Sequence, residues 1–72
     1  MQIERLVTMA NQIADYFAAE PDRTEAIAAA AGHLRRFWDP RMRRQIIAHV
    51  NDSGEGLNDI ARAAVAQLAQ ST

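Results

Sequence analysis

The segment His33-Leu34-Arg35-Arg36-Phe37-Trp38-Asp39-Pro40-Arg41-Met42-Arg43-Arg44 contains the sharpest break in the helical pattern of this chain. Helical backbone is disfavoured at Asp39 because Pro40 follows it. The same Asp is a good N-cap residue, and Pro is favoured at the first position of a helix. This dipeptide therefore predicts the end of one helix and the start of the next, joined by a sharp turn.

Apolar residues on both sides of this turn recur every three or four positions, which is typical of amphipathic helices. The pattern predicts helices over about residues 2–19, 22–38, 40–51 and 58–70, and no segment alternates as a strand would. Asp22 and Asn58 are suitable N-caps for the second and fourth helices, and Glu25 is placed to complete a capping box with Asp22. The turn-rich residues 52–56 form the connector before the last helix.

The expected fold is all-α, a single domain over residues 1–72 built as a small compact array of four short helices. Short helices need mutual packing to be stable, and the turn at Asp39-Pro40 favours a large crossing angle over an up-and-down bundle. The residues that share the predicted inner faces are Ile3, Leu6, Val7, Ala10, Ile13, Ala14 and Phe17; Ile27, Ala30, Ala31, Leu34 and Trp38; Met42, Ile46 and Val50; and Ile60, Ala61, Ala64, Val65 and Leu68. Many of them are Ala, so the core is thin and a bound partner would add stability.

The composition excludes several classes of protein. The chain has 72 residues and no Cys, so it has neither a disulfide framework nor thiolate ligands for zinc. Its first residues lack the charged-then-apolar layout of a signal peptide, and no run approaches the roughly 20 apolar residues of a membrane span. We expect a cytoplasmic protein that does not enter a membrane.

Catalytic and metal-binding patterns are also poorly represented. His33 and His49 are too far apart in sequence to form a helical metal-binding pair, and they are expected at the edge of the core. No Gly-rich phosphate loop follows a strand, and the few Ser and Thr residues lack a base placed to activate them. We therefore expect no catalytic, metal-binding or cofactor-binding residues in this chain.

The arginines are the strongest candidate for a functional feature. Residues 33–44 hold five Arg and one Asp, whereas the whole chain has a formal net charge of −1. All eight basic residues are Arg, which offers planar bidentate donors and is enriched at the centres of protein interfaces. The predicted partner-binding residues are Arg35, Arg36, Trp38, Arg41, Arg43 and Arg44, with Trp38 partly in the core and partly an anchor. A solvated face without a partner is the alternative.

Three further residues are candidates for partner contact. Met9 and Tyr16 lie two turns apart on the first predicted helix, off its core-facing stripe. Phe37 is displaced from the Leu34–Trp38 face of the second helix. Met and aromatic residues are frequent at contact surfaces. They are equally suited to covering the edge of the helical array.

The segment from His33 to Gln45 closely resembles the signature of the delta subunit of soluble NAD-dependent formate dehydrogenase. The similarity extends to Met9-Ala10-Asn11-Gln12-Ile13 and to Gly54-Glu55-Gly56-Leu57, so it spans nearly the whole chain. The resemblance implies a small accessory subunit of a cytoplasmic complex that oxidises formate. Other subunits of such a complex carry the bis-molybdopterin guanine dinucleotide, iron–sulfur clusters and flavin, and they reduce NAD. The sequence of this chain does not distinguish a molybdenum enzyme from a tungsten enzyme.

The resemblance implies a role without catalytic residues in this chain. We expect a non-catalytic subunit that stabilises the formate dehydrogenase or helps to assemble it. Its arginines are the expected docking surface, and the catalytic alpha subunit is the favoured partner. One alternative is an assembly chaperone for cofactor insertion into that subunit, with the arginines facing the phosphates of the pterin dinucleotide. Another is a helix-turn-helix-like nucleic-acid module, which the net charge disfavours. Self-association of the isolated chain is a further expectation.

Overall fold

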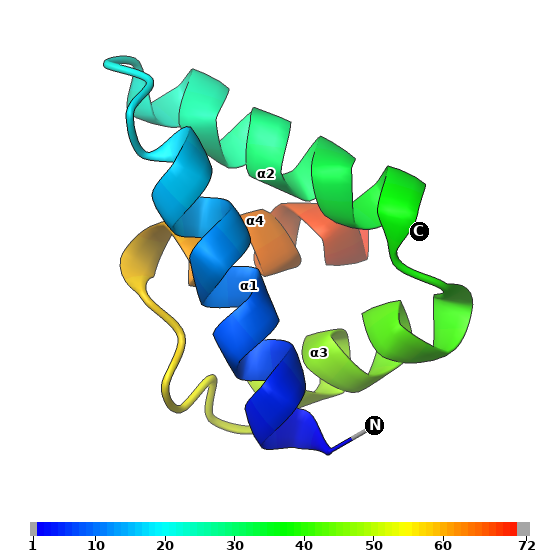
Figure 1. Ribbon diagram of the computed structural model, residues 1–72. Coiled ribbons are helices and arrows are strands. Elements are labelled where there is room, and N and C mark those ends of the chain that lie inside the picture. The colour runs from blue at the N-terminus through cyan, green and yellow to red at the C-terminus, as the bar shows by residue number, and fades with distance from the viewer. Residues whose placement is uncertain (1, 71–72) are drawn as a thin grey trace.

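The computed structural model describes residues 2–70, and within that range it consists of four α-helices without a strand (Figure 1). The helices are α1 (Ile3–Phe17), α2 (Arg23–Phe37), α3 (Pro40–Asp52) and α4 (Asp59–Gln70). The prediction of an all-α array of four short helices is confirmed. None of the helices in this range has the length and apolarity that crossing a membrane requires.

The turn at Asp39-Pro40 has the predicted structure. The Asp39 backbone is extended, with φ −72° and ψ 164°, and its carboxylate accepts a hydrogen bond from the Met42 N–H at 2.9 Å. Pro40 is the first residue of α3. The chain changes direction so sharply here that α2 and α3 make the least contact of any two helices. All three other helices pack against α4, and its largest contact is with α2.

The start of α2 differs from the prediction in one detail. The Asp22 carboxylate accepts hydrogen bonds from the backbone N–H groups of Thr24 and Glu25, as expected of an N-cap. The backbone N–H of Asp22, however, donates to the Glu20 side chain at 3.2 Å rather than to Glu25. The capping box with Glu25 was therefore a wrong prediction. Glu20 reaches Asp22 because α1 ends at Phe17, before the predicted residue 19, and the chain turns between the two helices.

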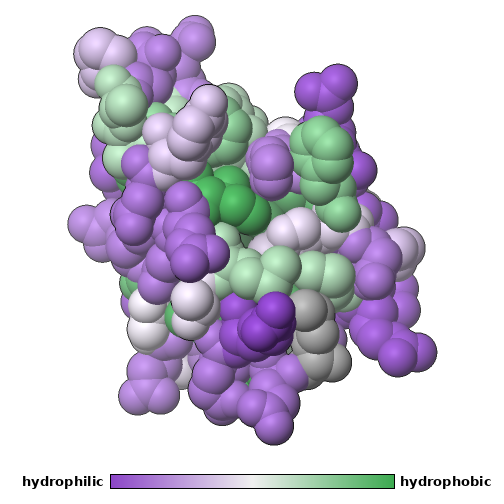
Figure 2. Space-filling model, in the orientation of Figure 1, coloured by the Kyte–Doolittle hydropathy of each residue, from purple (hydrophilic) through white to green (hydrophobic). Residues whose placement is uncertain are grey.

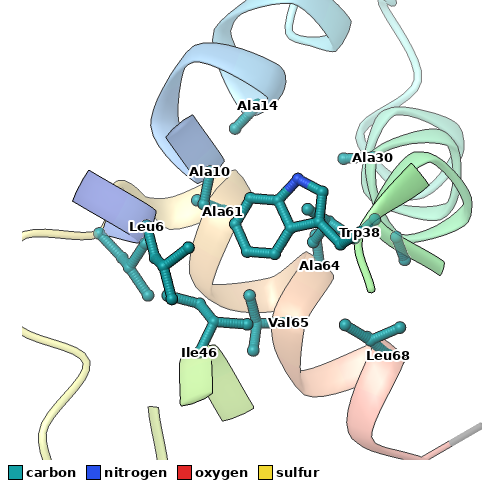
Figure 3. Close-up of a cluster of buried hydrophobic side chains, with 13 residues drawn as sticks. Leu6, Ala10, Ala14, Ala30, Trp38, Ile46, Ala61, Ala64, Val65 and Leu68 are labelled. Atoms are coloured by element: carbon teal, nitrogen blue, oxygen red, sulfur yellow. The ribbon is translucent and has the colours of Figure 1, made fainter. Parts of the chain in front are cut away.

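The core lies where α1, α2 and α4 meet, with Ile46 of α3 at its lower edge (Figure 3). Its buried members are Leu6, Ala10, Ala14, Ala30, Ala31, Leu34, Trp38, Ile46, Leu57, Ala61, Ala64, Val65 and Leu68. Alanines at the helix crossings leave room for the large Trp38 ring between the helices. All the predicted inner-face residues are either in this cluster or packed against it, and Leu57 is a member that the helical periodicity did not predict.

The connector between α3 and α4 closes over the core in a fixed conformation. Gly54 and Gly56 have φ of +68° and +88°, values that residues with a side chain rarely adopt. The N–H of Gly54 donates to the His49 carbonyl at 2.8 Å, and its own carbonyl accepts from the Arg62 guanidinium at 3.1 Å. His49 Nε2–H donates to the carbonyl of Glu55 at 2.8 Å. The connector is therefore held to the helices on both sides of it.

Asn11 of α1 joins the same connector to the first helix. Its side-chain NH₂ donates to the Gly56 carbonyl, and its side-chain oxygen accepts from the backbone N–H of Asn58, both at 2.9 Å. Asn58 in turn donates to Asp15 and caps α4 by accepting from the Ala61 N–H at 2.8 Å. The predicted cap at Asn58 is confirmed, and the Asn11 amide makes the α1–connector junction specific.

Candidate docking surface

The arginine corner, defined as Arg35, Arg36, Arg41 and Arg44, lies at the junction of α2 and α3. The first two are in the last turn of α2, and the other two follow Pro40 at the start of α3. All four side chains are exposed. Within residues 2–70, the guanidinium groups of Arg36, Arg41 and Arg44 make no hydrogen bond or ion pair. Three unpaired cations thus project from one corner of a chain whose net charge is −1.

Arg43 has a different position from the other predicted docking residues. Its side chain is half-buried, and its guanidinium donates to the carbonyls of Arg35 at 2.9 Å and Trp38 at 2.6 Å. Carbonyls at the C-terminus of a helix lack intrahelical partners and carry partial negative charge. Arg43 therefore holds the start of α3 against the end of α2, and less of its hydrogen-bonding capacity is left for another molecule.

We expect Arg43→Met to lower the free energy of unfolding by about 1–2 kcal/mol, because it removes two charged hydrogen bonds that join the start of α3 to the end of α2. Arg44→Met is the matched control, since Arg44 is exposed and makes no such bond; it should change stability by less than about 0.5 kcal/mol. Urea unfolding followed by circular dichroism measures both. Equal effects of the two substitutions would contradict the role of Arg43.

The predicted candidates Met9 and Tyr16 line a groove between α1 and α2. The groove has a volume of about 590 Å³, and its walls and floor are Met9, Gln12, Ile13, Tyr16, Phe17, His33 and Trp38. Figure 2 shows it from the side of α1, where apolar green surface lies in a hollow between hydrophilic margins. Volumes of this order are typical of sites that bind small molecules or protein side chains. The structure thus brings Met9, Tyr16 and Trp38 together, although they come from separate parts of the sequence.

A row of aromatic rings crosses this groove from α1 to α2. The ring centroids of Tyr16 and Phe17 are 5.0 Å apart, those of Phe17 and His33 6.1 Å, and those of His33 and Phe37 4.7 Å. The inner two rings are half-buried, whereas Tyr16 is 77% exposed and Phe37 is 71% exposed. His33 therefore lies at the edge of the core, as expected. The row ends in two large aromatic side chains that the fold does not cover.

Trp38 forms part of both the core and the groove. Only 5% of its surface is exposed, and its ring lies among the core residues of α1 and α4 (Figure 3). The nitrogen edge of the indole is turned toward Ala14 on α1 and Ala30 on α2. No residue in the described range accepts a hydrogen bond from the indole N–H, and the nitrogen is not completely buried. The N–H is consequently available to an acceptor that enters the groove.

Sequence reasoning missed the groove because its walls come from two helices whose packing angle is not encoded by either one alone. Ile13 and Phe17 were predicted as core residues and His33 as an edge residue, and all three are half-buried along the groove. Gln12 was noted only as part of the segment that resembles the family signature. The position of Met9 and Tyr16 on one side of the first helix, off its core-facing stripe, was the sequence signal for this surface.

The described part of the chain contains no cluster of three or more His, Asp or Glu side chains that could hold a metal ion. Iron–sulfur ligation through thiolates is also excluded because the sequence has no Cys. The histidines make contacts within the chain, His33 with aromatic rings and His49 with the connector.

Comparison with known families identifies a match over most of the chain. Residues 5–65, which extend from α1 into α4, match the family described as NADH-dependant formate dehydrogenase delta subunit FdsD. No curated protein and no solved structure gave a significant match.

Proposed function

The chain belongs to the delta-subunit family of NADH-dependent formate dehydrogenase, and from this premise we propose that it is a non-catalytic accessory subunit that docks through its arginine corner. Its partners are other subunits of the formate dehydrogenase complex. We propose that the catalytic subunit is one of them and that this chain is located in the cytoplasm. In this role the subunit stabilises the assembled complex or assists its assembly.

The proposal rests on the exposed guanidinium groups of Arg36, Arg41 and Arg44, which make no hydrogen bond or ion pair with the described residues 2–70. Arginine binds carboxylates with two parallel hydrogen bonds, and such pairs are strongest where water is excluded from the interface. The rest of the molecule is acidic, so these cations are concentrated at one corner. A negatively charged patch on another subunit would complement this corner in charge and in hydrogen-bonding geometry.

We expect the double substitution Arg41→Glu with Arg44→Glu to release the subunit from the complex. Charge reversal replaces two attractive contacts by two repulsive ones, so the affinity should fall at least about a hundredfold. The helical fold should survive, because acidic residues are favoured in the first turns of a helix and both side chains are exposed. The measurement is the subunit ratio after co-purification, with circular dichroism of the isolated chain as the folding check.

Arg5→Glu with Arg23→Glu is the matched control. These arginines are also exposed and lie in the first turns of α1 and α2, away from the corner. The control produces the same change in net charge and should co-purify like the unmodified chain. Full occupancy of the Arg41→Glu, Arg44→Glu variant in the complex would overturn the docking corner as the binding surface.

The same guanidinium groups could bind phosphate, which supports a transient assembly factor as the second candidate. The subunit ratio in the mature, active enzyme distinguishes the two roles. A permanent subunit is present in a fixed ratio to the catalytic subunit, whereas an assembly factor is absent from that form.

Binding to nucleic acid has less support. The Asp39 carboxylate occupies the N-terminus of α3, where it accepts a hydrogen bond from the Met42 N–H. A nucleic-acid phosphate at this position would need that N–H as a donor. Family membership also points to protein partners.

A further inference from the structure

We propose that the groove between α1 and α2 receives an apolar side chain from an acidic segment of another formate dehydrogenase subunit, with Trp38 Nε1–H donating a hydrogen bond to a backbone carbonyl of that segment. The inference rests on the proposed function, because it assumes that the chain docks on the complex. It adds a second contact surface and the chemistry of its occupant.

The groove itself predicts an apolar occupant. Met9, Ile13 and Phe17 give it apolar walls, and the exposed ring of Tyr16 borders it. A volume of about 590 Å³ accommodates a large aliphatic or aromatic side chain together with adjoining backbone. Aromatic and Met side chains are enriched at the centres of protein interfaces, where an anchoring side chain fills a pocket of this kind.

The Trp38 indole indicates that the occupant also brings a hydrogen-bond acceptor. An indole N–H at the edge of an apolar groove is open to water, and an occupant that displaces the water must bring an acceptor of its own. In the described range this N–H has none, and its nitrogen edge faces the α1–α2 side of the ring (Figure 3). A backbone carbonyl next to the anchoring side chain would supply the missing acceptor.

Charge complementarity indicates that the segment is acidic. Trp38 forms the floor of the groove and is separated by only a few residues from Arg36 and Arg41, whose guanidinium groups have no partner in the part of the chain that the structure describes. The apolar hollow in Figure 2 gives way to hydrophilic surface toward the α2–α3 turn of Figure 1. A segment lying in the groove would thus extend toward these cations.

Photocrosslinking in the purified complex tests the identity of the occupant. A benzophenone amino acid is placed at Gln12, which is exposed and lines the groove, and at Gln67 of α4 as the control. Mass spectrometry then identifies the attached peptide. We expect position 12 alone to attach to a peptide of another formate dehydrogenase subunit that has net negative charge and a large apolar residue. Attachment to a second copy of this chain, or to a basic peptide, would overturn the proposal.

Two substitutions test the contact itself, with affinity for the complex depleted of this chain as the measurement. Gln12→Trp should obstruct the groove and weaken binding at least about tenfold, whereas Gln67→Trp should change it less than about twofold. Replacing Trp38 by benzothienylalanine, which has sulfur in place of the N–H, should leave stability unchanged and weaken binding about three- to tenfold. Circular dichroism confirms that each variant is folded.

The outcomes separate the two proposals. In one outcome, Arg41→Glu with Arg44→Glu releases the subunit, but Gln12→Trp and the benzothienylalanine variant both bind like the unmodified chain. The groove is then not a contact surface, and the proposal of the arginine corner is retained. If the unmodified chain does not bind the depleted complex, both proposals are wrong.

Discussion

Trp38→Ala should unfold most of the isolated chain at 25 °C. Replacing a buried Trp by Ala in a packed core typically lowers stability by about 3–5 kcal/mol, and domains of this size have little more than that in total. The ring is only 5% exposed and fills the space between α1, α2 and α4 (Figure 3). Its neighbours are mainly Ala, whose short side chains cannot move inward to close the cavity.

Urea unfolding monitored by far-ultraviolet circular dichroism measures this effect, because Trp38 is the only Trp of the chain and its fluorescence is lost on substitution. Phe37→Ala is the control, since that ring is 71% exposed, and it should lower stability by less than about 1 kcal/mol. A Trp38→Ala variant as stable as Phe37→Ala would show that Trp38 does not hold the helices together.

Asn11→Ala is expected to lower the free energy of unfolding by about 2–3 kcal/mol, a large effect for a polar substitution. The change leaves the partly buried Asn58 N–H without its partner, at a cost of about 1–3 kcal/mol, and also removes the exposed hydrogen bond to the Gly56 carbonyl, which contributes about 0.5–1.5 kcal/mol. Gln12→Ala is the matched control, because Gln12 is the exposed neighbour on the same helix, and it should change stability by less than about 0.5 kcal/mol.

Hydrogen exchange of the Asn58 amide reports on the Asn11 contact directly. The amide should exchange faster in Asn11→Ala than in Gln12→Ala, since only the first removes its acceptor. Asn11→Asp should not restore stability, because it keeps the acceptor for Asn58 but directs a carboxylate oxygen toward the Gly56 carbonyl. Unchanged exchange and stability in Asn11→Ala would contradict the proposed role of this junction.

The Asn11 junction joins two segments that are far apart in the sequence. The structure places Asn11 against Gly56, and both residues lie inside the family match. Asn11 therefore has a structural role within the chain, whereas the guanidinium groups of Arg36, Arg41 and Arg44 make no hydrogen bond or ion pair within residues 2–70.

Features that depend only on neighbouring residues could be predicted from the sequence. The sharp turn at Asp39-Pro40 follows from steric exclusion before Pro and from side-chain capping, both of which act within a few residues. The inner faces of the helices follow from the period of 3.6 residues per turn, so every predicted core residue lies in or against the core. The charge of the arginine segment is likewise a property of composition.

Contacts between residues that are distant in the sequence depend on how the helices pack together. Asn11 and Gly56 are 45 positions apart in the sequence, and their contact depends on the angle at which α1 crosses the connector. The same packing places Arg43 against carbonyls at the end of α2, and Trp38 beneath a groove that α1 and α2 form together. Helix crossing angles result from the fit of all side chains at once, so a local pattern in one helix cannot specify them.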